Sequence, residues 1–178
     1  MSIRPILEAP DPRLRLISKP VDAVDDSIRT LVADMFETMY DANGIGLAAI
    51  QVGEPLRVLV IDLQERADGE EGEEPKTVND PRVFINPEIL DPDADTKIYN
   101  EGCLSVPEQY ADVERPAGCR ARWMDLDGMQ HDELIEGMLA TCLQHEMDHL
   151  EGILFIDHLS RLKREMVLRK LAKLKKAA

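Results

Sequence analysis

The first clear hydrophobic pattern lies between residues 25 and 44. Apolar side chains recur there every three or four positions, the spacing at which they share one face of an α-helix. Asp25 and Ser27 are residues that favour a helix start, and Asn43 with Gly44 is typical of a helix end. We therefore predict an amphipathic helix that ends near Asn43 and Gly44. Its apolar face consists of Ile28, Leu31, Val32, Met35, Phe36, Met39 and Tyr40.

Short apolar and β-branched runs further along the chain indicate strands rather than helices. The clearest runs are residues 56–62 and 83–86, which have proline-containing stretches nearby. Weaker runs predict further strands at residues 98–99, 110–113, 119–126 and 131–137. Asp127 and Gly128 form the kind of pair that closes a β-hairpin, so we expect the last two strands to be joined by a tight turn.

An acidic stretch at about residues 65–80 separates the two clearest strands. Its sequence, within QERADGEEGEEPKTVNDP, combines glycine with like charges. Both features work against packing, so we expect a solvated, mobile surface loop there. A simple insertion without a function is a sufficient explanation for it.

Two further helices are predicted near the end of the chain. Residues 137–150 have helical spacing with Gly152 as a stop, and the predicted buried positions are Leu139, Leu143, Met147 and Leu150. The last helix, at about residues 160–176, carries Leu162, Met166, Leu168, Leu171 and Leu174 among basic residues. The predicted order is a helix, a series of strands and then two helices. Because strands and helices do not alternate regularly, this order predicts an α+β fold.

Length and composition are those of one globular domain over residues 1–178. The chain has 178 residues, of which 44% are hydrophobic, enough to bury a core. It has no run of eighteen apolar residues and no secretory signal pattern at its start, so we expect a cytoplasmic protein. The net charge is −14, with eight basic residues and one acidic residue from Ser160 onward. An acidic body therefore carries a basic tail.

The segment QHEMDHLEG, residues 144–152, contains two of the four histidines of the chain. A helix advances 100° per residue, so His145 and His149 lie on one face, about 6 Å apart along the axis. This spacing suits one metal ion. Glu146 lies slightly to one side, where it reaches a metal-bound water without being a ligand. An amphipathic helix with two surface histidines is the alternative explanation.

The third ligand of such a site has several candidates, because a catalytic metal usually binds three protein ligands and a water. Glu165 would give the ligand set of a metalloprotease. Cys142 lies too far along the helix from His149, so we expect it to pack. Cys103, in the irregular segment NEGCLSVP, would complete a Cys/His/His set that suits Fe²⁺, Zn²⁺, Co²⁺ or Ni²⁺. A buried structural thiol is the alternative for Cys103.

The glycine-rich segment GIGLAAIQVG, residues 44–53, directly follows the first predicted helix. A helix stop explains Gly44, but a second glycine at position 46 and a polar Gln51 among apolar residues need another reason. The segment lacks the third glycine of a dinucleotide-binding fingerprint and does not follow a strand. We therefore expect a loop that lets the backbone of a substrate come close.

Taken together and in this order, GIGLAAIQ, EGCLS and QHEMDH resemble the three signature motifs of the peptide deformylases, the polypeptide deformylase family. The likeness to bacterial members covers nearly the whole chain, because APDPRLR, DMFETMY and GILFIDHLS are similar to theirs too. Each motif alone is moderately specific, and the ordered set is very specific. The resemblance implies small mixed or antiparallel sheets packed around a central metal-binding helix, with an N-terminal and a C-terminal helix.

Carried over position by position, the resemblance makes Cys103, His145 and His149 the metal ligands. The implied cofactor is one divalent metal ion, Fe²⁺ in the cell, with Zn²⁺, Ni²⁺ or Co²⁺ able to replace it. Because a cysteine ligand on Fe²⁺ is open to oxidation, we expect the iron form to lose activity in air.

The same resemblance implies a hydrolase that removes the N-formyl group from the N-terminal formylmethionine of newly synthesised polypeptides and releases formate. Glu146 would act as general acid and base on a metal-bound water. The side-chain amide of Gln51 and the backbone N–H of Leu104 would point at the developing oxyanion.

Residues that contact the substrate are also implied by the resemblance. An extended peptide would lie along the glycine segment and add main-chain hydrogen bonds as an extra strand. Related enzymes can carry Arg where Tyr110 stands, so this wall of the pocket differs within the family. The implied substrate-binding residues are Gly44, Ile45, Gly46, Gly102, Tyr110, Met138 and Cys142.

The expected partners are N-formylmethionyl nascent polypeptides and, through the basic C-terminal helix, the ribosome. The basic helix would dock on ribosomal RNA, whereas a solvated helix packed by its leucines is the simpler explanation. We expect no membrane, no sequence-specific nucleic acid and a monomer.

Two other classes of function compete with this one. A metallo-endopeptidase would use the same helix with Glu165 or another downstream ligand, would cleave internal peptide bonds and would tolerate Cys103→Ala. A non-catalytic metal-binding module would keep its metal after Glu146→Gln and hydrolyse nothing. The presence of Gln51 and Leu104 favours hydrolysis over simple metal binding.

Overall fold

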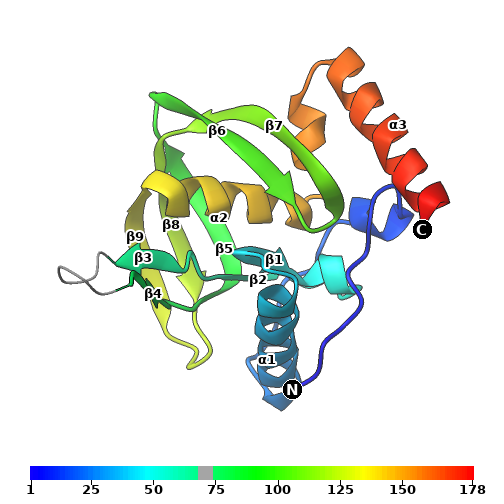
Figure 1. Ribbon diagram of the computed structural model, residues 1–178. Helices are drawn as coiled ribbons and strands as arrows, with labels where there is room; N and C mark the ends of the chain where they lie inside the picture. Colours follow the sequence, from blue (N-terminus) through cyan, green and yellow to red (C-terminus); the bar gives the residue numbers. More distant parts are fainter. Residues whose placement is uncertain (68–73) are drawn as a thin grey trace.

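A computed structural model describes residues 1–67 and 74–178 of the chain (Figure 1). The α-helices are α1 (Asp26–Asp41), α2 (Gly137–Leu150) and α3 (Arg161–Ala177). Short 3₁₀ helices are η1 (Pro12–Arg15), η2 (Ala49–Val52) and η3 (Phe155–His158). The strands are β1 (Gly46–Ala48), β2 (Val58–Ile61), β3 (Glu65–Ala67), β4 (Lys76–Val78), β5 (Arg82–Pro92), β6 (Thr96–Cys103), β7 (Val106–Pro116), β8 (Gly118–Met124) and β9 (Gln130–Glu136).

Antiparallel pairing organises these strands into three sheets. The largest has five strands in the order β1-β2-β5-β8-β9, so β1 and β9 form its edges. The pairs β3–β4 and β6–β7 form two smaller sheets, each of two strands. Figure 1 shows α2 in the middle of the molecule, with the β6–β7 pair on one side and the large sheet on the other. This arrangement confirms the predicted α+β fold with sheets around a central helix.

Strand β2 explains why the large sheet lies between two helices. All four of its residues are buried, and successive side chains of a strand point to opposite faces. Leu59 and Ile61 pack in the core beneath α2, whereas Val58 and Val60 pack in the core beneath α1. A strand buried on both faces has a continuous apolar run, as the sequence has here.

Helix α1 matches the amphipathic helix predicted from residues 25 to 44. The Asp25 carboxylate caps it by accepting the Ile28 N–H at 3.1 Å. Among the predicted apolar positions, Phe36 and Tyr40 are partly buried, and the other five are buried. Helix α1 therefore closes one face of the sheet and delivers the chain to residue 44.

The predicted hairpin and helix ends agree with the structure. Gly128 has a φ of 77°, a left-handed conformation that glycine adopts without strain, and it lies between β8 and β9. Helix α2 covers the predicted residues 137–150. Leu143 and Leu150 are buried as predicted, but Leu139 and Met147 are only partly buried at the edge of the core.

Helix α3 packs through a narrow stripe. Val167 and Leu171 are buried against β7, η3 and the N-terminal segment, whereas Leu162 and Met166 are exposed. The Ser160 hydroxyl caps the helix by accepting the Lys163 N–H at 3.3 Å. The leucines of this helix therefore contribute unequally to its packing.

Within the loop predicted at residues 65–80, the structure has two short strands, because β3 and β4 pair there as Glu65 with Val78 and Ala67 with Lys76. Their side chains are all exposed, so no alternation of apolar and polar residues marked these strands. Backbone hydrogen bonds hold such a pair without an apolar face. Residues 68–73 of the predicted loop, and its expected mobility, lie outside the described residues.

In the part of the chain that the structure describes, none of the helices combines the length and apolar character needed to cross a bilayer.

Candidate metal centre

Three side chains from two distant segments meet beside α2. Cys103 ends strand β6, and His145 and His149 lie one turn apart on α2. One ligand atom from each falls within 4.8 Å of the other two. The Cys103 Sγ is 3.4 Å from the His149 Nε2. Among the described residues, this is the one group of three or more potential ligands that could hold a metal ion.

The orientation of both rings suits a tetrahedral ion. The Nδ1 of His145 is 2.8 Å from the Glu101 Oε1, which leaves its Nε2 for a metal. The His145 and His149 rings are 5.3 Å apart between centroids and inclined by 70°. Ligand atoms at about 2.0–2.3 Å from a tetrahedral ion lie roughly 3.5 Å from one another. The donor set and its spacing therefore fit a divalent metal.

The charges around these ligands also favour a cation. Burial opposes a charge on His145, yet its bonds to Cys103 and Glu101 raise its pKa well above the ordinary value. The negative groups that would hold a proton there would equally hold a divalent cation. Burial lowers the pKa of His149 well below its ordinary value, so its ring is neutral and able to donate a lone pair.

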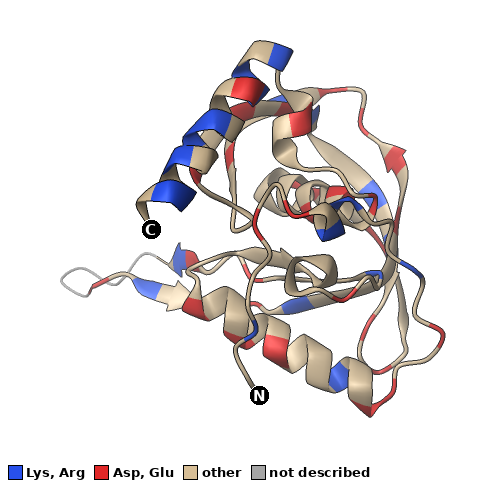
Figure 2. Cartoon of the chain, turned by 90° about the vertical axis from the view of Figure 1, so that its right-hand side faces the viewer, with Lys and Arg blue, Asp and Glu red and all other residues tan. Residues whose placement is uncertain are grey.

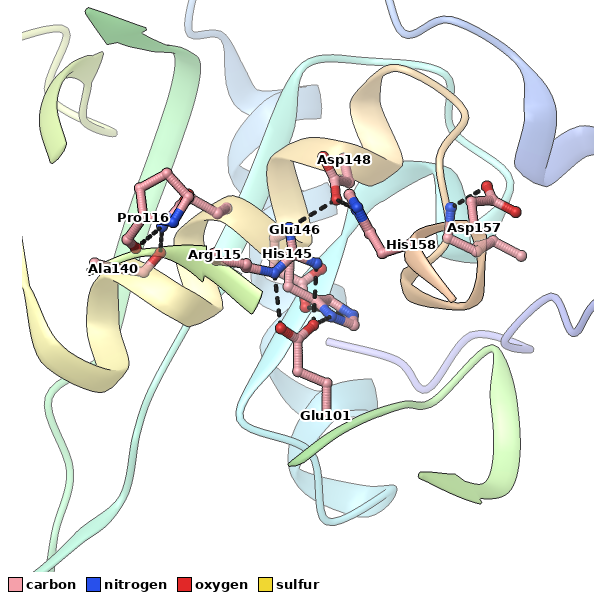
Figure 3. A network of polar contacts seen from close by, with 11 residues as sticks. Glu101, Arg115, Pro116, Ala140, His145, Glu146, Asp148, Asp157 and His158 are labelled. Carbon is pink, nitrogen blue, oxygen red and sulfur yellow. Dashed lines mark hydrogen bonds and ion pairs between the residues drawn. The ribbon is translucent and has the colours of Figure 1, made fainter. Parts of the chain in front are cut away.

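Glu101 and Arg115 support the site from behind (Figure 3). Arg115 binds Glu101 through two bonds, of 2.7 and 3.0 Å, and both side chains are about 95% buried. The third contact of Arg115 is to Asp148 at 2.9 Å, and His158 binds the same carboxylate oxygen at 2.8 Å. Although burial opposes it, the bonds to His145 and Arg115 lower the pKa of Glu101. Glu101 is therefore ionised and fixes the tautomer of His145.

Glu146 is a buried carboxylate beside the candidate ligands. It is 4% exposed, and burial raises its pKa to about 7. Its Oε2 has no hydrogen-bond partner within the described residues, and its Oε1 is 4.0 Å from the His145 Nε2. A carboxylate in this state accepts and returns a proton near neutral pH.

Gln51 is held next to the sulfur of Cys103. Its Oε1 accepts the Ala48 N–H at 2.9 Å, which fixes the orientation of the side-chain amide. Its Nε2 is 3.0 Å from the Ser105 hydroxyl and 3.6 Å from the Cys103 Sγ. Leu104 follows Cys103 in the turn between β6 and β7. The polar Gln51 is thus explained by contacts that span more than fifty residues of sequence.

These residues face a cavity of about 450 Å³. Its walls include every site residue predicted from the sequence except His149, which is fully buried behind the others. Ile45, Tyr110 and Met138 are 40%, 69% and 42% exposed, so they form the rim rather than the floor. The predicted residues that line the cavity are Gly44, Ile45, Gly46, Gln51, Gly102, Cys103, Leu104, Tyr110, Met138, Cys142, His145 and Glu146.

Two glycines give the cavity its shape. A Cβ added to Gly46 would lie 2.7 Å from the Glu146 Oε1, so a side chain there would displace that carboxylate. A Cβ on Gly102 would lie 2.5 Å from the ring of Tyr110, which crosses the backbone at that point. The glycines are therefore required by close approach rather than by an unusual φ.

The other candidate ligands lie elsewhere or carry a proton. Glu165 is on α3, where it pairs with Arg161 at 3.1 Å. Burial raises the pKa of Cys142 well above its ordinary value, so it is a thiol that packs beside Glu146. Cys119 is buried in β8. Cys103 is thus the cysteine that joins the two histidines, as the sequence favoured.

The polar residues behind the ligands were missed by the sequence reasoning. Glu101 stands in EGCLS and Asp148 in HEMDH, so their neighbours gave a weak signal. Arg115 and His158 lie outside both motifs, and local spacing does not assign either of them to a metal site. Only the pairing of β6 with β7 and the position of η3 bring them to α2.

Comparison with known proteins identifies close relatives. The model of the family described as "Polypeptide deformylase" matches residues 3–165. A peptide deformylase of Rhizorhabdus wittichii is 72% identical over 177 residues, which cover 99% of this chain and 98% of that protein. A peptide deformylase of Novosphingobium aromaticivorans is 65% identical over 188 aligned positions that cover both chains completely.

Solved structures are similar over the same extent. The crystal structure of a peptide deformylase from Legionella pneumophila has a TM-score of 0.86 at 47% identity, and the match covers 99% of this chain and 97% of that one. A peptide deformylase from Ehrlichia chaffeensis, crystallised in complex with actinonin, has a TM-score of 0.86 at 42% identity, covering 97% of this chain and 98% of that one.

The support that Glu101 gives to His145 leads to a prediction. Glu101→Gln keeps the shape of the side chain but removes the charge shared by Arg115 and His145. We expect bound Co²⁺ to be lost to an excess of chelator about 10- to 100-fold faster than from the unchanged protein. The matched control is Asp132→Asn, which removes a carboxylate that pairs with Arg120 and Arg122 on the surface. Equal release rates for Glu101→Gln and the control would contradict the prediction.

Proposed function

The chain belongs to the polypeptide deformylase family and is a metal-dependent hydrolase, and from this premise we propose which residues carry out its reaction. The substrate is the N-terminal formylmethionine of a newly synthesised polypeptide, and the products are formate and a free α-amino group. The observation that carries the assignment is the meeting of Cys103, His145 and His149 within 4.8 Å, with Glu146 beside them on the cavity wall.

Cys103 Sγ and the Nε2 atoms of both histidines would hold the metal. A bound divalent metal supplies a Lewis acid that acidifies water and polarises the formyl carbonyl. The thiolate adds negative charge to the ligand set, which makes the metal a weaker Lewis acid. Removal of the proton from water therefore depends more strongly on the Glu146 carboxylate. Glu101 keeps His145 in the tautomer that presents Nε2.

Glu146 moves the proton. It accepts a proton from the attacking water as the oxygen bonds to the formyl carbon, and it then donates that proton to the amine nitrogen as the C–N bond breaks. Its pKa, raised by burial to about 7, suits both steps at neutral pH. The unpartnered Oε2 gives it a free position from which to bind water.

Gln51 and the backbone N–H of Leu104 stabilise the oxyanion that develops on the formyl oxygen. The Gln51 amide is fixed by Ala48 and Ser105, so it needs no reorganisation during the reaction. A donor of this kind is worth about 3 kcal/mol of barrier. Leu104 follows the ligand Cys103 directly, which keeps its N–H close to the reacting atoms.

The cavity receives the methionine side chain and the first residues of the peptide. Cys142 and Met138 contribute sulfur-containing, polarisable surfaces that suit a thioether. Gly46 leaves room for the Glu146 carboxylate on one wall, and Gly102 with Tyr110 forms another wall. The edge strand β1 accepts the extended peptide as an added strand.

Fe²⁺ is the metal in the cell, and Zn²⁺, Ni²⁺ or Co²⁺ can replace it. A mixed set of one thiolate and two imidazoles suits any of these ions, so the choice follows from supply as well as affinity. The enzyme acts as a monomer in the cytoplasm. Measuring the metal content of the protein purified without oxygen tests the first proposal, and sedimentation velocity tests the second.

Helix α3 binds ribosomal RNA, and this places the enzyme close to where nascent chains leave the ribosome. Figure 2 shows basic segments repeated along this helix, whereas acidic segments are spread over the rest of the chain. Arg169, Lys170 and Lys173 are exposed, so they are free to meet phosphate groups. The acidic body would disfavour non-specific contact with nucleic acid elsewhere.

Removal of the proton carrier gives the sharpest test of the reaction. Formate release from formyl-Met-Ala should fall about 100- to 10,000-fold in Glu146→Gln, because the amide cannot transfer a proton. Metal content should be unchanged, since Glu146 is not a ligand. Glu151→Gln, at the exposed end of the same helix, is the control and should retain activity. Full activity of Glu146→Gln would refute the assigned role.

The thiolate ligand makes the iron form sensitive to oxygen. Protein loaded with Fe²⁺ should lose formate-releasing activity in air within the time that the Ni²⁺ form keeps it, because iron and Cys103 are oxidised together. Parallel incubations with and without oxygen, each followed by activity and by mass spectrometry of Cys103, check this. The expectation fails if both metal forms survive air equally.

Charge reversal tests the docking helix without unfolding it. Deleting α3 would remove the buried Val167 and Leu171, so we choose the exposed triple change Arg169→Glu, Lys170→Glu and Lys173→Glu. Co-sedimentation with ribosomes should weaken, and its logarithmic salt dependence should fall by about one unit for each lost phosphate contact.

The control for this experiment is the pair Arg29→Glu and Lys97→Glu, which reverses exposed charges on α1 and β6. Turnover of formyl-Met-Ala should be unchanged in both variants. Docking through α3 is excluded if the triple variant binds ribosomes as tightly as the control pair.

A further inference from the structure

The peptide is proposed to pair with the edge strand β1, and the accessible backbone at this edge is the short segment 44–46, which joins α1 to β1. Gly46 pairs with Ile61, and the Ile45 carbonyl accepts the Asp62 N–H at 2.9 Å. The register between β1 and β2 begins at Gly46, and strand β2 ends at Ile61. Backbone pairing with β2 therefore does not reach Gly44.

Beyond the last backbone hydrogen bond between the two segments, the side chain of Gln64 holds the backbone of Gly44 in place. The Gln64 Nε2 donates to the Gly44 carbonyl at 3.0 Å. The Gly44 N–H is used at the other side, where it donates to the Met39 carbonyl at the end of α1. Gly44 is thus held between the end of α1 and the side chain of Gln64.

Gln64 is kept in an uncommon conformation to make this contact. Its φ is 52°, in the left-handed region that residues with a side chain seldom adopt. Asp62, a fully buried carboxylate, accepts the backbone N–H groups of Gln64 at 3.1 Å and Asp80 at 3.0 Å, and the Tyr40 hydroxyl at 2.5 Å. A strained backbone persists only when its surroundings determine it in this way, and such residues cluster at binding and catalytic sites.

The segment points from the reacting groups toward the cavity rim. A Cβ on Gly46 would meet the Glu146 carboxylate, whereas a Cβ on Gly44 would lie 2.7 Å from the Leu104 Cδ1. Gly46 and the residues after it are buried, and Ile45 is exposed. A peptide whose formyl group lies at Glu146 therefore runs from Gly46 toward Gly44, and its later residues pass Gly44.

We propose that Gln64 is a positioning residue for the part of the substrate that follows methionine. Gln64 fixes the Gly44 carbonyl, so the backbone is held in place beyond the start of β1. The peptide backbone then meets a fixed segment that runs from β1 back to Gly44. This role depends on the proposed function, because it concerns the same substrate in the same cavity. It predicts that Gln64 affects long substrates and spares the shortest one.

The experiment compares N-formylmethionine amide with formyl-Met-Ala-Ser-Ala in two variants. Gln64→Glu has the same shape but turns a donor into an acceptor that repels the Gly44 carbonyl. Gln64→Asn shortens the reach, and Asn tolerates a left-handed backbone well, so thermal stability should be kept. In Gln64→Glu, KM for the tetrapeptide should rise about 3- to 10-fold, the effect of one hydrogen bond. We expect a smaller rise in Gln64→Asn, and unchanged kcat, metal content and KM for the amide in both.

The matched control is Glu65→Gln, the next residue, whose side chain is exposed on β3. It should leave both KM values unchanged. An unchanged KM of Gln64→Glu for the tetrapeptide, or an equal rise for both substrates, would overturn the role of Gln64. An unchanged protein that releases no formate from either substrate would instead overturn the proposed function, and the role of Gln64 with it.

Discussion

The main constraint on the structure is the burial of helix α2, which carries the polar side chains of His145, Glu146 and His149. Helix α2 lies between the large sheet and the β6–β7 pair, where unpaired polar groups are strongly destabilising. His145 is not left unpaired, because it contacts the Glu101 carboxylate, whose charge is balanced by Arg115. Arg115 in turn contacts Asp148 on α2 itself. The network therefore fixes the helix to the strands that also carry Cys103, so one set of ion pairs holds both halves of the metal centre.

The surroundings of this network give two carboxylates opposite properties. Glu101 accepts bonds from Arg115 and His145, which keep its pKa low and its charge permanent. Glu146, one residue after His145, has an Oε2 without a hydrogen-bond partner among the described residues, and burial raises its pKa to about 7. One carboxylate is thus fixed as an orienting group, and the other is free to exchange a proton. Groups whose surroundings move their pKa values apart are a mark of acid and base chemistry.

The cavity and the substrate edge result from close backbone approach. Gly46 and Gly102 leave room for Glu146 and Tyr110, and β1 stays at the edge of the sheet with its outer side toward the cavity. Beyond the end of β1, the backbone is held by a side chain, Gln64, rather than by a neighbouring strand. The edge that we propose to bind the peptide is therefore built from the same hydrogen-bonding groups that build sheets, which suits a substrate recognised mainly through its backbone.

Elements with their own hydrophobic periodicity, and reactive side chains that lie close together along the chain, were predictable from the amino-acid sequence. Helix α1, helix α2 and the hairpin at Gly128 follow from local spacing, and His145, Glu146 and His149 share one helical turn. The β3–β4 pair escaped prediction because its exposed side chains show no alternation, and Arg115 and His158 escaped because neither lies in one of the three signature motifs. Local spacing left both Cys103 and Glu165 open as the third ligand; the family resemblance favoured Cys103, and the folded chain brings Cys103 to the histidines. Contacts between residues tens of positions apart depend on strand pairing and helix packing, and local patterns do not encode either.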